Sequence, residues 1–364
     1  MDYSKMDFKE VLKRINALYN KSKNEGLTEE EKKEQAEIRK YYISVITGNV
    51  KGNLNKVEKI DKETNEKKRR IDMKFTGTTY RPPVEGDTVL LQVTEGCAHN
   101  KCTFCTMYKD TKFSIEQLSQ IEKDILQIKE HFGNINRIFL VNGDAFVLSA
   151  RRLKEISDLL IKHIPSIETI SMYASVSNIK GKSDSELVML KEARINDLYI
   201  GLETGHEATI DRINKGHTLE DAYTQLERLN KTGIVHHTGL MLGVAGKGLG
   251  IENAKATAKL LNTVKPGLIW AGTLGIFEGS ELSAQVEKGE FTPASELEII
   301  EEEIELLNSL ELKNIKFYGV HPTNTASIYG VLPNNKEELI QKLQNTIEKL
   351  DNEVLNSSVK RHSL

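Results

Sequence analysis

The stretch TVLLQVTEGCAHNKCTFCTMY, residues 88–108, is the part of this sequence that decides the fold. It begins with a short apolar run, which predicts a buried β-strand, and continues into a loop that holds all three cysteines of the 364-residue chain. Cys97, Cys102 and Cys105 follow the spacing C-x4-C-x2-C. An odd number of clustered cysteines excludes an internal disulfide framework. In a reducing compartment, such a cluster indicates metal binding or redox chemistry.

The composition of the chain is that of a globular protein. Hydrophobic residues make up 38% and charged residues 28%, which excludes the disordered, collagen-like and disulfide-scaffold classes. The sequence has no run of roughly 20 apolar residues, the length that a membrane span needs. Its start, MDYSKMDFKE, lacks the apolar core of a secretory signal. We therefore expect a cytoplasmic protein that does not bind a membrane.

The charge is unevenly distributed along the chain. The formal net charge of −3 gives no general indication of a nucleic-acid partner. Residues 1–75, however, carry 19 Lys and Arg against 14 Asp and Glu, so nucleic acid remains an open possibility for this segment. The same segment differs from the rest of the chain in its pattern of apolar residues.

Residues 1–58 are predicted to form a helical hairpin. Apolar residues recur at helical spacing over residues 8–19, and Gly26 interrupts the pattern. A second helix is expected to begin at Thr28, whose side chain would form a capping box with Glu31. Residues 59–80 are charged and nearly free of apolar periodicity, and we predict that they form a linker.

From residue 87 onward, short β-rich runs alternate with amphipathic helical runs, which is typical of a parallel sheet. We predict an α/β fold over residues 81–312, a partial (βα)6 barrel of the triosephosphate-isomerase type, with a flat doubly wound sheet as the alternative. A C-terminal extension with a helix would follow over residues 313–364. The active site is expected at the carboxyl ends of the strands. The predicted strands are residues 88–94, 137–142, 168–175, 197–203, 236–243 and 268–274, and the predicted helices include 114–132 and 219–233.

Three thiolates in one loop suit a four-iron cluster, because three irons are then held by the protein and the fourth stays free to bind a small molecule. Two alternatives remain open at this point. One is a structural zinc ion with His99 or a more distant histidine as its fourth ligand. The other is three thiols without any metal.

The cysteine loop resembles that of the radical S-adenosylmethionine (radical SAM) superfamily. That superfamily commonly carries C-x3-C-x2-C after its first strand, with an aromatic residue before the last cysteine, as Phe104 stands here. This chain has one more residue between the first two cysteines. The segment YIGLETGHEATIDRINKGHT, residues 199–218, resembles those of the oxygen-independent coproporphyrinogen oxidases and YgiQ-like proteins within the superfamily. Residues 15–57 resemble a different group, the uncharacterised YnzC-like family, which brings no known chemistry.

The radical SAM resemblance implies roles for residues at further strand ends. Gly143 and Asp144 would meet the amino group of SAM, Glu203 would bond its ribose hydroxyls, and Lys215 would pair with its carboxylate. Without the resemblance, a turn at 143–144 and a solvated Lys215 are the simpler interpretations. The other residues implied for SAM are Phe104, Ser175 and Gly243, and those expected on the substrate side are His237, His321 and Asn324. For Ser175 and the two histidines, an ordinary hydrogen bond in a turn or in the core is the alternative.

The resemblance also implies the chemistry. Cys97, Cys102 and Cys105 would bind a [4Fe–4S] cluster, a low-potential donor of the flavodoxin or ferredoxin type would reduce it, and SAM would be cleaved reductively. The resulting 5′-deoxyadenosyl radical would abstract hydrogen from a substrate that the sequence does not identify, and the enzyme would be oxygen-sensitive. The alternatives are a non-catalytic zinc or iron–sulfur protein, or an RNA or partner adaptor that acts through the N-terminal hairpin.

Overall fold

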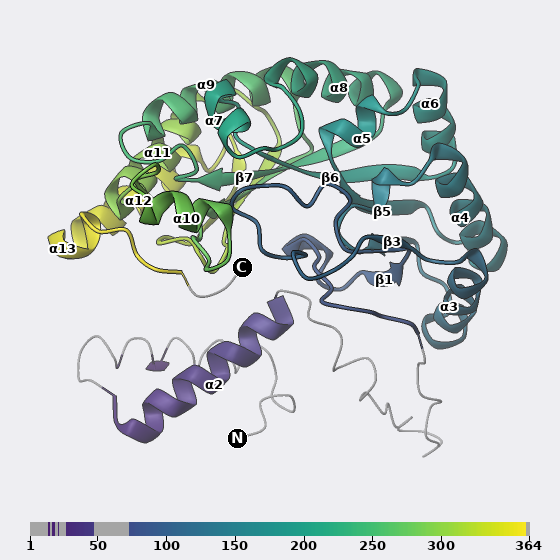
Figure 1. Ribbon diagram of the computed structural model, residues 1–364, viewed down its shortest axis with the longest axis horizontal. Helices are drawn as coiled ribbons and strands as arrows, with labels where there is room; N and C mark the ends of the chain where they lie inside the picture. The colour runs from purple at the N-terminus through teal and green to yellow at the C-terminus, as the bar shows by residue number, and fades with distance from the viewer. Residues whose placement is uncertain (1–13, 15–16, 19–20, 22–26, 47–72, 362–364) are drawn as a thin grey trace. The chain divides into compact units, whose positions relative to one another are not determined.

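The computed structural model describes residues 14, 17–18, 21, 27–46 and 73–361 (Figure 1). The chain divides into two compact units, Met1–Asp87 and Thr88–Leu364, which we describe separately. Most of the predicted first helix and of the predicted linker lies outside the described residues. The domain boundaries given above therefore stay predictions.

The described helix of the first unit is α2 (Glu29–Ile46). The Glu31 N–H donates to Thr28 Oγ1 at 3.2 Å, and the Thr28 N–H donates to Glu31 Oε2 at 3.0 Å. These two bonds are the predicted capping box, and they satisfy two backbone donors at the start of the helix. The same unit ends with a short 3₁₀ helix, η3 (Pro83–Glu85).

The second unit contains a sheet of eight strands whose spatial order follows the order of the chain. A doubly wound sheet reverses its order at a switch point, so the sequential order excludes that alternative in the described sheet. Seven neighbouring strands are parallel, and the eighth, β10 (Ile328–Leu332), pairs antiparallel with β9. The parallel strands are β1 (Val89–Gln92), β4 (Arg137–Val141), β5 (Thr169–Ala174), β6 (Ile195–Glu203), β7 (Val235–Leu242), β8 (Leu268–Thr273) and β9 (Ile315–Gly319).

All six predicted strands are confirmed, and they form the parallel α/β sheet that the sequence predicted. The prediction missed β9 and β10, which continue the sheet beyond residue 312. It also missed the small antiparallel pair β2 (Thr94–Glu95) and β3 (Ser114–Ile115) that flanks the cysteine loop. The strands of both pairs are short, so they give no clear periodic pattern.

Helices connect the parallel strands and form an arc outside the sheet (Figure 1). The two predicted helices are present as α3 and α8, and α8 begins with a capping box between Thr218 and Asp221. The helices are α3 (Leu118–Phe132), α4 (Ala150–His163), α5 (Val176–Lys180), α6 (Asp184–Glu192), α7 (Glu207–Arg212), α8 (Leu219–Thr232), α9 (Gly250–Val264), α10 (Glu281–Glu287), α11 (Glu296–Ser309), α12 (Lys336–Lys349) and α13 (Asn352–Leu355), with a 3₁₀ turn η4 (Ala145–Val147).

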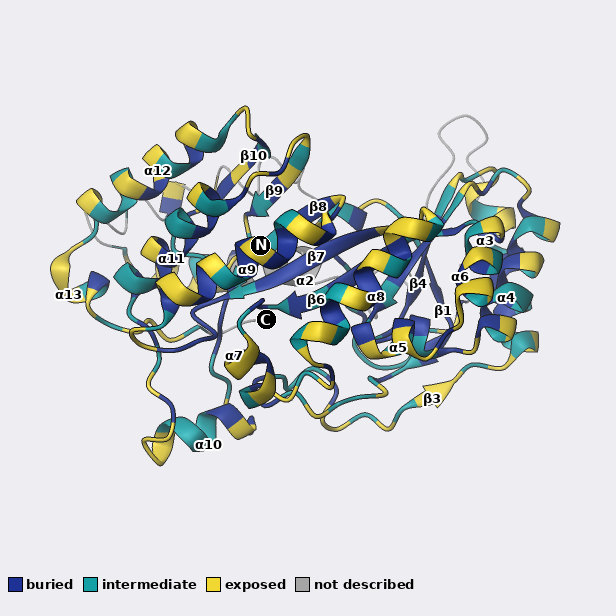
Figure 2. Cartoon of the chain, turned by 90° about the horizontal axis from the view of Figure 1, so that it is seen from above, coloured by how far each residue is buried: buried dark blue, intermediate teal, exposed yellow. Residues whose placement is uncertain are grey.

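The core lies between the sheet and these helices. Figure 2 shows the strands mostly buried and the helices with one buried and one exposed side. In α3, for example, Ile121, Ile125 and Ile128 are fully buried at spacings of one helical turn. Because the strands are parallel, all their carboxyl ends meet at one edge, where the loops with the predicted site residues emerge. Within the described residues, no helix combines the length and the apolar character needed to cross a membrane.

Candidate active site

The cysteine loop is tied to neighbouring segments by its backbone. The Thr103 N–H donates to the Ile213 carbonyl at 3.0 Å, and the Leu282 N–H donates to the Thr103 carbonyl at 2.9 Å. Within the loop, the Asn100 N–H contacts Cys97 Sγ at 3.4 Å, and the Asn100 side chain donates to the Tyr108 carbonyl at 2.8 Å. These bonds fix the loop against the segment after α7 and against the start of α10.

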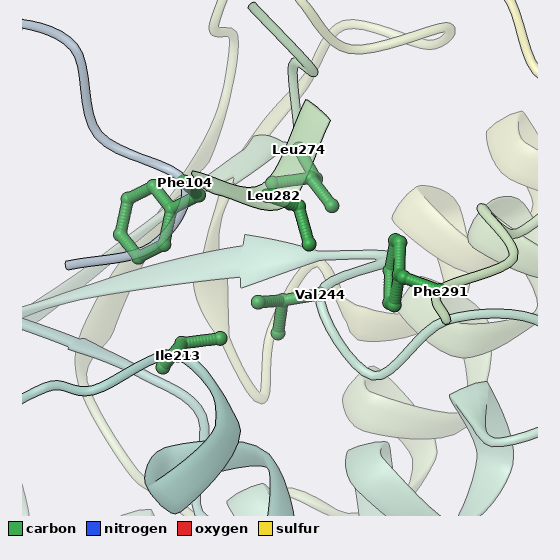
Figure 3. Packing of buried hydrophobic residues seen from close by; sticks show 6 residues of the cluster. All are labelled: Phe104, Ile213, Val244, Leu274, Leu282 and Phe291. Carbon is green, nitrogen blue, oxygen red and sulfur yellow. The ribbon is translucent and has the colours of Figure 1, made fainter. Parts of the chain in front are cut away.

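A cluster of buried apolar side chains packs against the cysteine loop. Figure 3 shows six buried side chains from separate segments that converge on one centre. Cys102 and Cys105 pack against this cluster, and all three cysteines are half-buried and free of disulfide bonds. The cluster consists of Phe104, Ile213, Val244, Leu274, Leu282 and Phe291. Phe104 therefore packs in the core at the base of the loop.

Burial raises the pKa of the Cys102 and Cys105 thiols, and the nearby Lys215 ammonium partly opposes this effect. A metal takes cysteine as thiolate, so binding at this loop would release protons. Among the described residues, no three His, Cys, Asp or Glu side chains converge on a point suited to one metal ion. A [4Fe–4S] cluster has a different requirement, because each cysteine binds a different iron atom. Three free thiols on one loop match that donor set.

Gly143, after β4, lies directly against the cysteine loop. Its φ is +57°, and a Cβ at this position would lie 2.0 Å from the Gly96 carbonyl oxygen. Its N–H donates to the Tyr108 hydroxyl at 3.1 Å. Only glycine permits this approach, so position 143 sets the distance between the two loops.

Asp144 is buried, with 6% of its surface exposed. Burial raises the pKa of its carboxyl group to about 6, although a hydrogen bond from Asn178 and the charge of Lys182 oppose this shift. Its Oδ1 has no hydrogen-bond partner among the described residues. A buried carboxylate oxygen without a partner is costly, and an ammonium group of a ligand would satisfy it.

Glu203 and Lys215 form an ion pair with each other. The resemblance had implied that they bind two different groups of SAM. Lys215 Nζ lies 2.7 Å from Glu203 Oε1, and the two side chains are 15% and 12% exposed. Burial alone would lower the pKa of Lys215, but the charges of Glu203 and Cys102 raise it above its usual value. The ammonium also lies 5.9 Å from the centre of the Phe104 ring. Sequence spacing cannot show this pairing.

Two local features direct Glu203 to this position. The register of β6 against β7 shifts between Gly201 and Glu203, and Glu203 has a left-handed φ of +66°. A bulge of this kind turns a side chain away from its regular direction. A Cβ at Gly201 would lie 2.4 Å from Glu203 Oε1 and 3.3 Å from Lys215 Nζ, so glycine leaves the room that the pair occupies.

Gly243, which the resemblance placed at the adenine edge, has a φ of +77° at the end of β7. Its N–H is already engaged, because it donates to Glu302 Oε2 at 2.8 Å. Ser175 likewise has a structural partner, since it caps α5 through a reciprocal pair of bonds with Asn178. These bonds favour the turn role that was the alternative for Ser175.

His237 does not lie at the site. It is near the amino end of β7, where its ring packs on Tyr199 at 4.7 Å and its Nε2 lies 3.7 Å from Asp197. Other aromatic residues whose rings contact Tyr199 are Phe139, Tyr173 and Trp270. The prediction for His237 is therefore wrong, because alternation along the strand gives the direction of a side chain but not its height in the sheet.

His321 and Asn324 follow β9 and thus lie at the same edge of the sheet as the cysteine loop. Asn324 donates to the Ala271 carbonyl at 2.9 Å and accepts from the Thr273 hydroxyl at 3.2 Å. His321 Nδ1 lies 2.7 Å from Thr323 Oγ1, and burial lowers the pKa of its ring. Asn324 thus connects this turn to β8, and both the NH2 group and the oxygen of its side-chain amide form hydrogen bonds.

A cavity of about 670 Å³ adjoins the cysteine side of the sheet. Gly243 and Leu274 form one wall, and Leu274 also belongs to the apolar cluster below the cysteine loop. The segment 358–361 also lines the cavity. Arg361 holds this segment through an ion pair with buried Glu296 at 2.9 Å.

Sequence reasoning missed several buried polar residues around the site. Lys182 Nζ donates to the Phe146 carbonyl at 2.7 Å. Burial lowers the pKa of Lys182 to about 8, although the charge of Asp144 opposes this shift. Burial, together with the nearby charge of Lys215, also lowers the pKa of His217 to about 4. The Glu-rich run 301–303 gave no sign that Glu302 and Glu303 would be buried.

The comparisons with known families agree with the cysteine loop and the strand order. The model of the radical SAM superfamily matches residues 91–261. The chain contains a radical SAM domain. This result confirms the predicted superfamily and the prediction of an enzyme; the assignment to a subgroup stays a prediction. The model of a bacterial protein family of unknown function, DUF896, matches residues 10–68.

Several relatives with high identity match the N-terminal segment. A UPF0291 protein of Clostridium acetobutylicum is 60% identical over 55 residues, which is 15% of this chain and 100% of that protein. A UPF0291 protein of Clostridium botulinum is 62% identical over 55 residues, 15% of this chain and 89% of that protein. The N-terminal segment therefore belongs to this family, as the YnzC-like resemblance predicted.

Among solved structures, the radical S-adenosylmethionine methyltransferase TsrM from Kitasatospora setae aligns with a TM-score of 0.46 at 12% identity, over 60% of this chain and 45% of that one. Coproporphyrinogen III oxidase from Escherichia coli aligns with a TM-score of 0.46 at 16% identity, over 61% and 52% of the two chains. The chain thus spans about half the length of these two structures.

Proposed function

We propose that the protein binds a [4Fe–4S] cluster through Cys97, Cys102 and Cys105 and cleaves S-adenosylmethionine reductively. The observation that carries the proposal is that the three free thiols lie at the same strand edge as the Glu203–Lys215 pair and the unpartnered Asp144 oxygen. When bound, a cluster with one open iron supplies the electron that splits SAM into methionine and a 5′-deoxyadenosyl radical, which abstracts hydrogen from a substrate.

The side chains of the chain itself bind and orient SAM. Asp144 accepts a hydrogen bond from the SAM ammonium group, which satisfies its Oδ1. Lys215 attracts the methionine carboxylate, and its raised pKa keeps it charged throughout the neutral range. Glu203 then accepts from a ribose hydroxyl with the oxygen that does not bind Lys215.

The cavity beside Gly243 and Leu274 receives part of the substrate in this proposal. It supports this role by its position, because one wall is the strand end proposed to face SAM. A flavodoxin-type or ferredoxin-type donor reduces the cluster, and the thiolate-bound iron makes the enzyme oxygen-sensitive. Because of this oxygen sensitivity, we also propose a cytoplasmic location.

Release of 5′-deoxyadenosine tests the proposal. Protein reconstituted anaerobically with iron and sulfide is mixed with dithionite and SAM, and the product is measured by liquid chromatography. We expect release from the native chain and from Thr106→Ala, a control in the same loop, but not from Cys102→Ala. A cluster-loaded native protein that releases no 5′-deoxyadenosine contradicts the proposal, as does release that persists in Cys102→Ala.

A further inference from the structure

A buried chain of hydrogen bonds joins two strand ends of the proposed site through helices outside the sheet. Asn253, on α9, is its central residue and is 3% exposed. Its Nδ2 donates to Glu302 Oε1 at 2.7 Å, and its Oδ1 accepts from the Thr204 hydroxyl. Glu302, on α11, accepts at its other oxygen from the Gly243 N–H at 2.8 Å.

The first strand end in this chain is that of β6. Thr204 directly follows Glu203, whose left-handed φ of +66° is unfavourable for a residue with a side chain. A second residue of α9 supports the same turn, because the Gly205 N–H donates to Thr257 Oγ1 at 2.9 Å. A strained conformation of this kind persists where the surroundings over-determine it.

The second strand end is that of β7. Gly243 has a φ of +77°, and its N–H is directed toward Glu302. The two oxygens of Glu302 each accept one bond, from Gly243 and from Asn253, whereas a glutamine amide would offer only one accepting oxygen. Glu302 is fully buried and has no cationic partner in the described part of the chain, so the bonds from Gly243 and Asn253 are what stabilise it there.

We infer that Asn253 is a positioning residue, which holds the ends of β6 and β7 in the arrangement that SAM binding requires. The inference rests on the proposed function, because Glu203 and Gly243 are the residues it positions. Asn253 itself lies outside the sheet, behind Thr204, and acts through the two strand ends. Substituting a residue that orients the binding residues typically weakens ligand affinity without removing any direct contact.

The same helix offers a matched control. Asn262, nine residues further along α9, also bridges two segments: its Nδ2 donates to the Ser309 carbonyl at 3.0 Å, and its Oδ1 accepts from the Glu311 N–H at 2.8 Å. Asn262→Ala therefore also removes two amide hydrogen bonds from α9, although these two join the side chain to backbone groups. A second pair of variants separates the effect of the Thr204 hydroxyl from the effect of side-chain size. Thr204→Val keeps the size but removes the hydroxyl that donates to Asn253, and Thr204→Ser keeps the hydroxyl.

Two measurements test the inference on the full chain. Hydrogen exchange of the native protein without SAM reports on residues 203–206 and 243–246. We expect faster exchange in both segments for Asn253→Ala and unchanged exchange for Asn262→Ala. Equilibrium binding of S-adenosylhomocysteine to the cluster-loaded protein should weaken roughly tenfold in Asn253→Ala and Thr204→Val. Asn262→Ala and Thr204→Ser should bind as the native chain does.

Equal effects of Asn253→Ala and Asn262→Ala on exchange and on binding overturn the inference, since both substitutions would then act only through general stability. Faster exchange confined to one strand end also overturns it. If the native, cluster-loaded protein neither binds S-adenosylhomocysteine nor cleaves SAM, the proposed function fails instead. The exchange result still decides in that case whether Asn253 holds the two strand ends.

Discussion

Lys215 Nζ and Glu203 Oε1 lie 2.7 Å apart at the carboxyl end of the sheet, next to the loop that holds the cysteines. The pair is mostly buried, and it joins residues that are twelve positions apart in the sequence. Because the pair joins a cation and an anion, their charges balance each other at this edge of the sheet. In the proposed complex, Lys215 would face the carboxylate of SAM, and Glu203 would accept from a ribose hydroxyl.

Replacing Lys215 by methionine should destabilise the protein, because Glu203 would be left without its charged partner. We expect a loss of roughly 1–3 kcal/mol in the free energy of unfolding, measured by denaturant titration. Lys154→Met is the control, since Lys154 pairs with Asp158 at 2.7 Å on the exposed side of α4. Its loss should stay below about 0.5 kcal/mol. Equal losses in the two variants would show that the Glu203–Lys215 pair is no more than a surface contact.

Gly143→Ala should displace the cysteine loop, because the new Cβ would meet the Gly96 carbonyl at 2.0 Å. Gly133→Ala separates this collision from backbone strain: its φ of +64° is similar to that of Gly143, and nothing lies within 4 Å of its new Cβ. We expect roughly 1–3 kcal/mol of destabilisation for Gly133→Ala, from backbone strain alone, and clearly more for Gly143→Ala.

Cluster incorporation gives the second readout for this pair. After anaerobic reconstitution, Gly133→Ala should hold about four iron atoms per chain, as the native protein is proposed to do. Gly143→Ala should hold less. Native-like iron content in Gly143→Ala would mean that the cysteine loop does not depend on its contact with position 143.

Glu303 should contribute a loss of stability as the pH rises. Burial, and then the neighbouring Glu302, raise the pKa of Glu303 to about 8, so the folded state keeps a proton that the unfolded state loses near pH 4.5. The folded state therefore loses stability as the pH rises from about 5 to about 8. Glu303→Gln should remove the part of this dependence that comes from Glu303, while Glu302 and Asp144, whose pKa values burial also raises, keep theirs. The variant should be more stable than the native chain at pH 8 by roughly 2–4 kcal/mol.

Denaturant titrations at pH 5 and pH 8 measure this difference. Glu301→Gln, on the exposed side of the same helix, is the control and should behave as the native chain at both pH values. An advantage of Glu303→Gln that is the same at pH 5 and pH 8 would show that Glu303 does not titrate in this range.

The sheet could be predicted from the sequence because its six main strands are nearly continuous apolar runs that precede turn residues or helices. The strand β9 was missed since its five residues, IKFYG, include a lysine and are too short to give a clear pattern. The cysteine loop was found because cysteine is rare in this chain and its metal chemistry is specific.

The finer geometry of the site could not be predicted in this way. The contact between Glu203 and Lys215 depends on a shift in strand register at Gly201, which no sequence pattern indicates. The burial of Glu302 depends on how α11 packs beside α9, and a run of glutamates predicts the opposite. His237 was misplaced because the prediction used only the alternation of side chains, although the predicted strand, residues 236–243, already put it near the amino end.

Electron paramagnetic resonance of the dithionite-reduced, reconstituted protein tests the central claim most directly. The account predicts the signal of a reduced [4Fe–4S] cluster, a change in that signal when SAM is added, and loss of the signal in Cys102→Ala. A cluster signal that SAM leaves unchanged, in protein shown to bind SAM, would contradict the claim that three cysteines leave one iron open to it.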